Sequence, residues 1–367
     1  MGVLAETASA GIMPKSPPRV NRCVDLLDLA LVNEASSRCT MPMDRALTTA
    51  APAAVRRNPF AGSVGLLAIA PAAAVLLAEL PDLHWTLDLA RHFPLHSALA
   101  LVLAALVLLP ARHPRLALIL LLLALLPAAR LLPLWSPGPP LLPANVPVLR
   151  TAMVNLLASN RTPERVAAWL EATDPDVVAL LEFTPAHERA LLRLRSRWPH
   201  AVTKPVASPF GIALFSKLPL RDTEVRPMGA SYAFAITATV TTAIGDVGVL
   251  AMHPPPPVSK ERAGERDLAF SQLASAIASL PAHRVVLTDC NATRWSRPFR
   301  NGLAAAGLDD GCSGHGYQGS WPSSLPWFLR VPIDHVLVSR DLAVHRRELG
   351  PDVGSDHLPV LAEVHVR

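Results

Sequence analysis

Three long apolar runs lie close together in the first third of the chain, at residues 63–80, 93–111 and 116–134. Each is close to the roughly 17–25 residues that a helix needs to cross the hydrocarbon of a bilayer. Buried helices of a soluble protein are the alternative, but runs this long with so little charge favour the membrane. The sequence therefore predicts a membrane anchor of three transmembrane helices over residues 62–134, with the lipid bilayer as its partner.

Charged residues next to these runs predict the side of the membrane on which each connection lies. Basic side chains precede the first run and fill the second connection (Arg56, Arg57, Arg112 and Arg115). The first connection, residues 81–92, carries Asp82 and Asp88 against a single Arg91. By the positive-inside rule the second connection is cytoplasmic, and everything after the third run is outside. We therefore expect a multi-pass protein of the cell (inner) membrane with an extracytoplasmic back half.

Two segments outside the apolar runs lack the patterns of folded structure. Residues 1–61 are rich in Ala, Ser, Thr, Pro and Arg without sustained periodicity, which predicts a disordered leader. Residues 135–147, WSPGPPLLPANVP, are dense in proline and predict a stiff, extended linker. The net charge of +5 is compatible with an anionic substrate or a membrane surface and does not choose between them. The four cysteines lack the spacing of a zinc site.

Residues 148–367 alternate between strand-like and helix-like segments, which predicts a mixed domain of strands and helices. Strands are expected at residues 148–155, 177–182, 211–216, 233–241, 247–253, 285–289, 333–339 and 358–366. Helices are expected at residues 163–172, 185 to near 198, 259–280 and up to 306, where Gly307 ends the last one. The long helix at 259–280 should turn Leu268, Leu273, Ile277 and Leu280 inward.

Polar side chains suited to phosphate or metal chemistry stand at the ends of these strands. The segment VVLTDCN ends in Asp289 and Asn291, which point to the same side if the strand stays extended. A carboxylate beside an amide suits water activation next to an anion, because one accepts a proton and the other donates hydrogen bonds. Other strands end or begin in similar residues: Asn155, Glu182, His253, Asp334, Asp356 and His357. Each could instead form a turn, carry a surface charge or be a satisfied loop histidine, but so many together favour one shared site.

A set of segments, in chain order, carries a resemblance to a known family: VNLLASN, VVALLEF, GIALFSKLPL, LAMHPPPP, VVLTDCNATRWSRPF, GSWP, VPIDHVLVS and GSDHLPVLAEV. They resemble the endonuclease/exonuclease/phosphatase superfamily, and in particular its membrane-attached bacterial members. The resemblance covers residues 148–367 and implies an α+β catalytic domain with the DNase I-like, four-layer αββα sandwich. One departure is that Thr288 and Cys290 flank Asp289, where the family usually has glycine and phenylalanine.

The resemblance implies a divalent-metal site for Mg²⁺ or Mn²⁺, whose oxygen-rich ligands would be Asn155, Glu182 and Asp356. It also implies five catalytic residues: His253, Asp289, Asn291, Asp334 and His357. Asp289 would orient or deprotonate the attacking water, and Asn291 would donate to a phosphate oxygen. His253 would polarise the phosphate or protonate the leaving oxygen. His357 would act beside the phosphate, with Asp334 accepting its other ring proton.

These roles imply a metal-dependent phosphodiesterase, a nuclease-like hydrolase that cleaves a phosphate ester by in-line water attack. Nucleic acid is one candidate substrate, and phospholipid or small-molecule phosphatase activity of the same fold is the alternative. A catalytically inactive, membrane-anchored binding module is the rival from another class, because the altered TDCN segment leaves it open. No protein partner is implied.

Two other features have more than one interpretation. Trp321 and Trp327, before Asp334, could stack on a base, dip into lipid or anchor their loop. Cys290 and Cys312 could form a disulfide in an oxidising compartment. A cysteine on a buried strand is, however, commonly a small apolar filler.

Overall fold

The structure is a computed structural model that describes residues 69–80, 84–110, 112–135, 142–143 and 145–367. All of these belong to one compact unit of the chain, residues 56–367. The predicted leader at 1–61, part of the linker at 135–147 and the beginning of the first apolar run lie outside the described residues. The boundaries expected there stay predictions.

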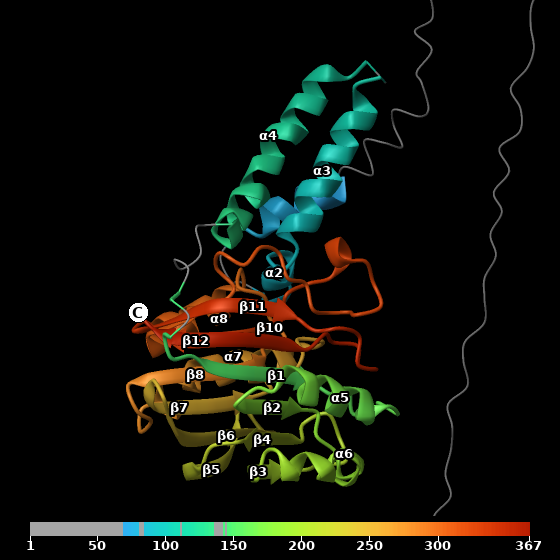
Figure 1. Ribbon diagram of the computed structural model, residues 1–367. Helices are drawn as coiled ribbons and strands as arrows, with labels where there is room; N and C mark the ends of the chain where they lie inside the picture. The colour runs from blue at the N-terminus through green and yellow to red at the C-terminus, as the bar shows by residue number, and fades with distance from the viewer. Residues whose placement is uncertain (1–68, 81–83, 111, 136–141, 144) are drawn as a thin grey trace, which may run out of the picture. The chain divides into compact units, whose positions relative to one another are not determined.

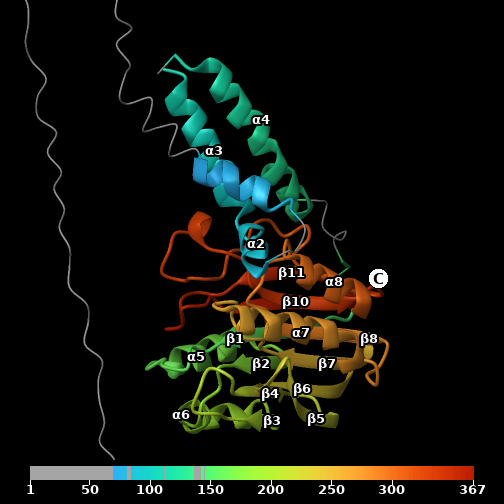
Figure 2. The same ribbon diagram turned by 180° about the vertical axis from the view of Figure 1, so that it is seen from behind.

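Two six-stranded sheets form the centre of the back half (Figures 1 and 2). The first has the order β11-β12-β1-β2-β4-β3, with bounds Leu342–Leu349, Val360–Val366, Leu149–Asn155, Val177–Leu181, Ile212–Ser216 and His200–Lys204. The second has the order β5-β6-β7-β8-β10-β9, with bounds Leu220–Met228, Ala230–Thr242, Gly245–Met252, His283–Asp289, Asp334–Ser339 and Leu308–Asp310. The pairs β1–β2 and β7–β8 are parallel, and β8 pairs antiparallel with β10. The strands that carry the candidate residues are thus central in both sheets.

The sheets pack face to face through alternating apolar side chains. Val285 and Leu287 of β8 belong to the core shared with the first sheet. Val286 between them packs instead with α7 (Lys260–Ala276) and α8 (Arg297–Ala306) on the outer face of the second sheet. This alternation has the period of two that a strand buried on both faces requires.

Helices also cover the outer face of the first sheet. They are α5 (Pro163–Thr173), α6 (Pro185–Ala190) and η2 (Leu192–Ser196), of which α5 and η2 contribute side chains to a core shared with that sheet. The layers therefore run helix, sheet, sheet, helix, with α7 and α8 seen from behind in Figure 2. The predicted α+β class, with paired central sheets, is confirmed.

Several elements differ from the expectations. The sequence pattern misses β3, β5, β9 and β11, because these strands are short or carry charged, exposed residues. The helix expected from 185 to near 198 consists of α6 and η2, since Leu191 between them leaves helical geometry with ψ near 9°. The inward orientation of Leu268 is wrong: this side chain is 48% exposed, and Phe270 is buried in its place.

The described front of the chain is helical. Residues 69–77 form a helix, followed by α2 (Trp85–Ala90), α3 (Pro94–Leu108), α4 (Pro114–Leu131) and η1 (Leu132–Trp135). Within the part of the chain that the structure describes, one helix, Pro114–Trp135, is long and apolar enough to cross a membrane. The helix α3 has 15 residues, fewer than a span needs. Three transmembrane helices are therefore not shown by these elements.

The connection that contains α2 packs on the helices of the domain. Asp88 is 3% exposed, and its carboxylate lies 3.1 Å from Nη2 of Arg266 in α7. The same carboxylate accepts hydrogen bonds from Ser296 Oγ at 2.8 Å and from the backbone nitrogen of Arg297 at 3.0 Å. Ser296 and Arg297 begin α8, and an anion is stabilising at the N-terminus of a helix. Asp88 thus joins the front of the chain to both α7 and α8.

Candidate active site

Asp289, the last residue of β8, lies at the centre of a cluster of polar side chains. It is 1% exposed. Its Oδ2 lies 3.0 Å from Asn155 Nδ2, 3.3 Å from His253 Nε2 and 3.5 Å from His357 Nε2. Asn155 ends β1 in the first sheet, whereas His253 follows β7 in the second. One carboxylate therefore connects strand ends from both sheets.

Glu182 directly follows β2 and lies beside Asn155. Asn155 Nδ2 donates to Glu182 Oε1 at 3.2 Å, and the backbone nitrogen of Ala158 donates to Oε2 at 2.7 Å. Asn155 Oδ1 accepts from the backbone nitrogen of Leu157 at 2.9 Å. The amide nitrogen of Asn155, rather than its oxygen, therefore faces Glu182 and Asp289.

His253 and Asn291 form a second pair beside Asp289. His253 Nδ1 lies 3.1 Å from the carbonyl oxygen of Pro209, and because a carbonyl only accepts, Nδ1 is the donor. Nε2 of the same ring lies 3.2 Å from Asn291 Nδ2. β8 ends at Asp289, as expected, and Asn291 has φ 47°, so the chain is not extended up to Asn291 and the condition for the two side chains to point to the same side is not met. The backbone nitrogen of Asn291 donates to Asp289 Oδ1 at 2.9 Å, and both side chains lie beside Nε2 of His253.

His357 completes the cluster from the loop before β12. Its Nδ1 lies 2.9 Å from Oδ2 of Asp334, and its Nε2 faces Asp289. Asp334 begins β10 and stands opposite Asp289 in the register of β8 and β10. The strand pairing itself therefore places the two carboxylates on either side of one imidazole.

Comparison with known proteins identifies the family of this chain. The family model described as the endonuclease/exonuclease/phosphatase family matches residues 151–357, which is more than half of the chain. The chain belongs to the endonuclease/exonuclease/phosphatase family.

Solved structures agree with this family at the level of the fold. The endonuclease/exonuclease/phosphatase from Bacteroides vulgatus is 17% identical, with a TM-score of 0.51 over 60% of this chain and 99% of that one. A functionally unknown conserved protein from Enterococcus faecalis is 16% identical, with a TM-score of 0.50 over 60% of this chain and 100% of that one. No curated protein matches the sequence.

The acidic and basic side chains of the site stabilise one another's charged forms. Burial works against ionisation of Asp289, but the imidazoles of His357 and His253 hold the pKa of this carboxyl well below its usual range. Burial likewise opposes the charged form of His357, yet Asp334 and Asp289 raise its pKa to about 10. The pKa of His253 is raised by Asp289 against the same cost of burial. An ionised carboxylate beside the protonated imidazole of His357 suits a site for a phosphate ester.

The donor set of the site fits a divalent cation, the cofactor on which this family generally depends. Ligand atoms of Asp289, Asp334 and His357 all lie within 4.8 Å of one another, but a protonated His357 leaves only the two carboxylates of this group to bind a cation. Among the described residues, Asp334 Oδ1 and Asp356 Oδ1 are buried without a hydrogen-bond partner. A buried carboxylate oxygen without a donor is costly, and a cation at this place would satisfy it.

Of the three predicted metal ligands, two line the pocket and one does not. Glu182 and Asp356 line one pocket of about 330 Å³ together with Asp289 and His357. Asn155 is buried behind them, with its oxygen already bound to the backbone. Its present geometry suits a residue that orients Glu182 and Asp289, and its role as a ligand stays a prediction.

The residues of this pocket that sequence reasoning missed include Phe210 and Arg262. The guanidinium of Arg262 lies 5.4 Å from the ring centre of Phe210 and 5.2 Å from that of Tyr232, as in a cation–π contact. Arg262 stands in the first turn of α7, where the helix dipole disfavours positive charge, and that position was the available signal. Trp321, considered for stacking, lines the same pocket and donates from Nε1 to Asp356 Oδ2 at 3.1 Å.

Both residues that flank Asp289 in the TDCN segment, Thr288 and Cys290, are buried. Cys290 is buried among the apolar side chains beneath α7 and α8, and its backbone nitrogen donates to the oxygen of Ile333 at 2.9 Å. Thr288 Oγ1 lies 3.5 Å from Cys290 Sγ. Both Cys290 and Cys312 are free, so the disulfide is not formed in this structure and Cys290 is an apolar filler.

Proposed function

We propose that this chain is a divalent-metal-dependent phosphoesterase that hydrolyses phosphodiester bonds by in-line attack of water. The observation that carries the proposal is the single carboxylate of Asp289 within 3.5 Å of an amide and two imidazoles. Glu182 and Asp356 would hold Mg²⁺ or Mn²⁺ at the mouth of the same pocket. The bound cation would neutralise charge that develops on the phosphate oxygens.

The side chains of the site would activate the water, stabilise the phosphate and protonate the leaving group. Asp289, kept ionised by its neighbours, would orient the attacking water and accept its proton. Protonated His357, oriented by Asp334, would donate to a phosphate oxygen as negative charge increases there. Asn291 would donate to the same group, and His253 would protonate the leaving oxygen.

We also propose that the front of the chain anchors the enzyme in the cell (inner) membrane through three helices, with the catalytic domain extracytoplasmic. The apolar helix Pro114–Trp135 exposes leucines over much of its length, Leu125 for example being 62% exposed. The contact of Asp88 with Arg266 supports the orientation, because the charge rule places the first connection and the catalytic domain on the same side. Reporter fusions after Trp135 and within residues 84–92 would test it.

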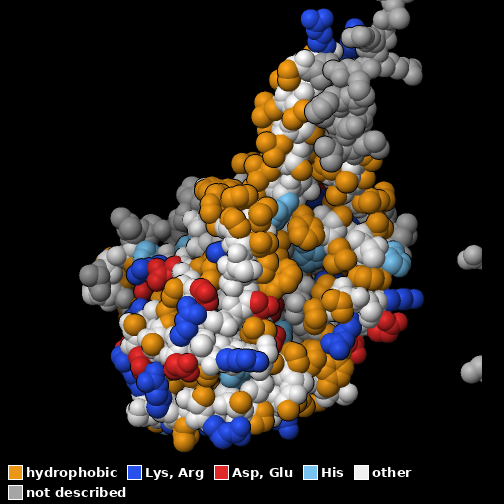
Figure 3. All heavy atoms as spheres, turned by 90° about the vertical axis from the view of Figure 1, so that its right-hand side faces the viewer, with side chains coloured by type: hydrophobic (Ala, Val, Ile, Leu, Met, Phe, Trp, Pro, Cys, Tyr) orange, Lys and Arg blue, Asp and Glu red, His pale blue; other side chains and the backbone are white. Residues whose placement is uncertain are grey.

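One feature favours a membrane-borne phosphate ester, such as a phospholipid, as a second candidate substrate. The loop that follows Trp321 exposes Leu325, Trp327, Phe328 and Leu329, with Trp327 61% exposed. The short helix η3 (Trp327–Leu329) lies beside α3. Figure 3 shows hydrophobic side chains that cover the front helices and continue onto the adjoining surface of the domain. An active site next to such a surface would meet substrates at the bilayer interface.

A metal and substrate panel with the full chain tests the proposal. We expect bis-p-nitrophenyl phosphate to be hydrolysed with Mg²⁺ or Mn²⁺, and the activity to vanish with EDTA and with Asp289→Asn. The substitution Asp222→Asn, at an exposed aspartate of β5, is the matched control. A folded chain that hydrolyses no soluble diester and no phospholipid vesicle with any divalent metal would instead be the inactive binding module.

A further inference from the structure

The loop that joins β8 to α8, residues 290–296, carries Asn291 to the active site. The domain itself holds the first part of this loop. The carbonyl oxygen of Ala292 accepts from Nε2 of His335 in β10 at 2.9 Å, and Asn291 Nδ2 lies 3.2 Å from His253 Nε2. The rest of the loop meets residues from the front of the chain instead.

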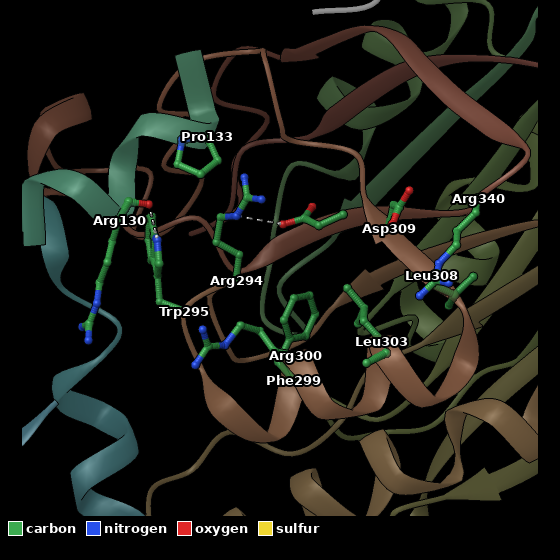
Figure 4. Close-up of a pocket in the computed structure, with 12 residues that line it drawn as sticks. Arg130, Pro133, Arg294, Trp295, Phe299, Arg300, Leu303, Leu308, Asp309 and Arg340 are labelled. Carbon is green, nitrogen blue, oxygen red and sulfur yellow. Dashed lines mark hydrogen bonds and ion pairs between the residues drawn. The ribbon is translucent and has the colours of Figure 1, made fainter. Parts of the chain in front are cut away.

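Contacts from the front of the chain hold the second part of the loop. The backbone nitrogen of Thr293 donates to His92 Nδ1 at 3.0 Å. Trp295 Nε1 donates to the carbonyl oxygen of Arg130 at 2.9 Å, at the edge of a pocket between α4 and α8 (Figure 4). Asp88 accepts from a side chain and a backbone nitrogen at the beginning of α8. The front of the chain therefore fixes the loop from Thr293 onward.

Within this set, His92 makes the contact that lies nearest to Asn291 along the chain. Its residue is 6% exposed, and Thr293 is fully buried. Burial lowers the pKa of His92 against the opposing effect of Asp88, so the ring is neutral at neutral pH. Since a backbone nitrogen only donates, Nδ1 is the acceptor and the ring proton is on Nε2, 3.5 Å from Asp88 Oδ2. The ring thus connects Asp88 to the loop of the active site.

The loss of this acceptor would disturb the loop. In the part of the chain that the structure describes, His92 Nδ1 is the one hydrogen-bond partner of the backbone nitrogen of Thr293. A buried nitrogen without an acceptor is costly, so the loop would shift to reach another one. Asn291, two residues earlier, would shift with it. A displacement of about 1 Å can lower turnover about a hundredfold, because the reacting groups lose their alignment.

We propose that the described part of the first connection, residues 84–92, is a positioning element of the active site, in which His92 is a positioning residue for Asn291. The front of the chain then completes the scaffold on which the phosphate is bound. This role rests on the proposed hydrolase function, but it does not depend on membrane insertion of the front helices.

Steady-state hydrolysis of bis-p-nitrophenyl phosphate by the full chain tests this role. His92→Leu removes the acceptor, and kcat should fall about tenfold to a hundredfold while KM and the Mg²⁺ requirement stay nearly unchanged. His92→Asn keeps an acceptor as many bonds from the backbone as Nδ1, so kcat should stay within about threefold of the native value. Trp295→Phe, which removes only the donor to Arg130, should lower kcat about threefold.

Ser339→Ala is the matched control, because it also removes a side-chain acceptor from a backbone nitrogen. Ser339 Oγ accepts from the nitrogen of Arg284 at 2.9 Å, at the ends of β10 and β8 that are far from the active site. This variant should lose thermal stability but keep the native kcat. Hydrogen exchange gives a readout independent of activity: residues 290–297 should exchange faster in His92→Leu than in the native chain or in His92→Asn.

The proposal would be overturned by a native kcat in folded His92→Leu, by equal losses in His92→Leu and His92→Asn, or by an equal loss in Ser339→Ala. If His92→Leu does not fold, a native kcat in Trp295→Phe has the same meaning. Absence of hydrolysis by the native chain counts against the proposed function instead. Unchanged exchange of residues 290–297 in His92→Leu would then show that His92 does not hold the loop.

Discussion

The imidazole of His357 is held between two carboxylates, Asp334 at Nδ1 and Asp289 at Nε2. This arrangement fixes both the orientation of the ring and its protonated state, which burial alone would oppose. A charge placed in this way needs little reorganisation when a phosphate develops negative charge, and that is the main source of electrostatic catalysis.

Asp334→Asn should therefore lower turnover without unfolding the domain. Asparagine has nearly the same shape but cannot stabilise the imidazolium, so His357 loses its charge near neutral pH. We expect kcat on bis-p-nitrophenyl phosphate to fall by about two to four orders of magnitude. Unchanged turnover in a variant with a native circular dichroism spectrum would remove Asp334 from the mechanism.

Glu182→Gln should instead weaken the binding of the metal. Glutamine keeps an acceptor for the backbone nitrogen of Ala158 but removes a charge from the cation site. The Mg²⁺ concentration for half-maximal activity should rise by at least about tenfold. Glu224→Gln, at an exposed glutamate of β5, should leave the metal titration unchanged.

The sequence allowed most of the candidate site to be predicted, since polar residues at strand ends are visible in the pattern. Asp289, Asp334 and His357 meet because β8 and β10 pair in the register that places the two aspartates opposite each other. Phe210 and Arg262 could not be placed, because they come from a loop and a helix whose position depends on tertiary packing. The orientation of the Asn155 amide depends on a turn at Leu157 that no spacing rule shows.

At the scale of elements, α2 acts as a cap for α8. The carboxylate of Asp88 accepts from Ser296 and Arg297 at the beginning of that helix. His92, four residues after Asp88, accepts from the backbone nitrogen of Thr293 at 3.0 Å, two residues after Asn291. The first connection therefore supports the backbone that carries part of the active site.

Asp88→Asn should destabilise the full chain. Burial opposes ionisation, but hydrogen bonds with His92, Ser296 and the backbone of Arg297 hold the pKa of Asp88 well below 3.8. A carboxyl with a lowered folded-state pKa contributes stability above its usual value and loses it as the pH falls below about 4. At neutral pH the variant should lose about 1–3 kcal/mol, and the difference from the native chain should shrink as the solution is acidified below pH 4.

Thermal unfolding between pH 3 and pH 7 measures this difference. Asp352→Asn, at an exposed aspartate whose ion pair with Arg165 spans 3.7 Å, is the control and should unfold like the native chain. A gap between native and Asp88→Asn chains that stays constant across this range would contradict the assignment to the carboxylate.

The central strands of the sheets were predictable from their apolar residues, and the strands at the sheet edges were not. The central strand β2 is a continuous apolar run, and β1 and β8 each contain a buried run of apolar residues before their polar ends, because both faces of these strands are buried. β5 and β11 carry charged residues on exposed faces, so their sequences resemble loops. Nothing in the six residues of α2 indicates that this short helix packs against a domain more than a hundred residues away.

At the scale of the whole molecule, the described front helices and the domain that follows them are parts of one folded unit. A fragment that begins at residue 148 would leave buried Arg266 without Asp88 and α8 without its cap. We expect this fragment to unfold at a lower temperature than the domain does in the full chain, because a buried charge loses one of its two carboxylates.

A peptide of residues 84–92, fused ahead of residue 148 by a flexible linker, should restore part of the lost stability. The same fusion with Asp88→Asn is the matched control. Equal unfolding temperatures for the plain fragment, the fusion and its control would show that the first connection contributes nothing to the domain.

The separation of Asp88 and Arg266 along the chain also has a consequence in time. The ribosome makes Asp88 178 residues before the arginine that it meets in the finished protein. The short segment must therefore wait for its partners in α7 and α8 while the residues between them are translated. Completion of α7 and α8 then closes the contact, so it joins parts of the polypeptide that are made at widely separated times.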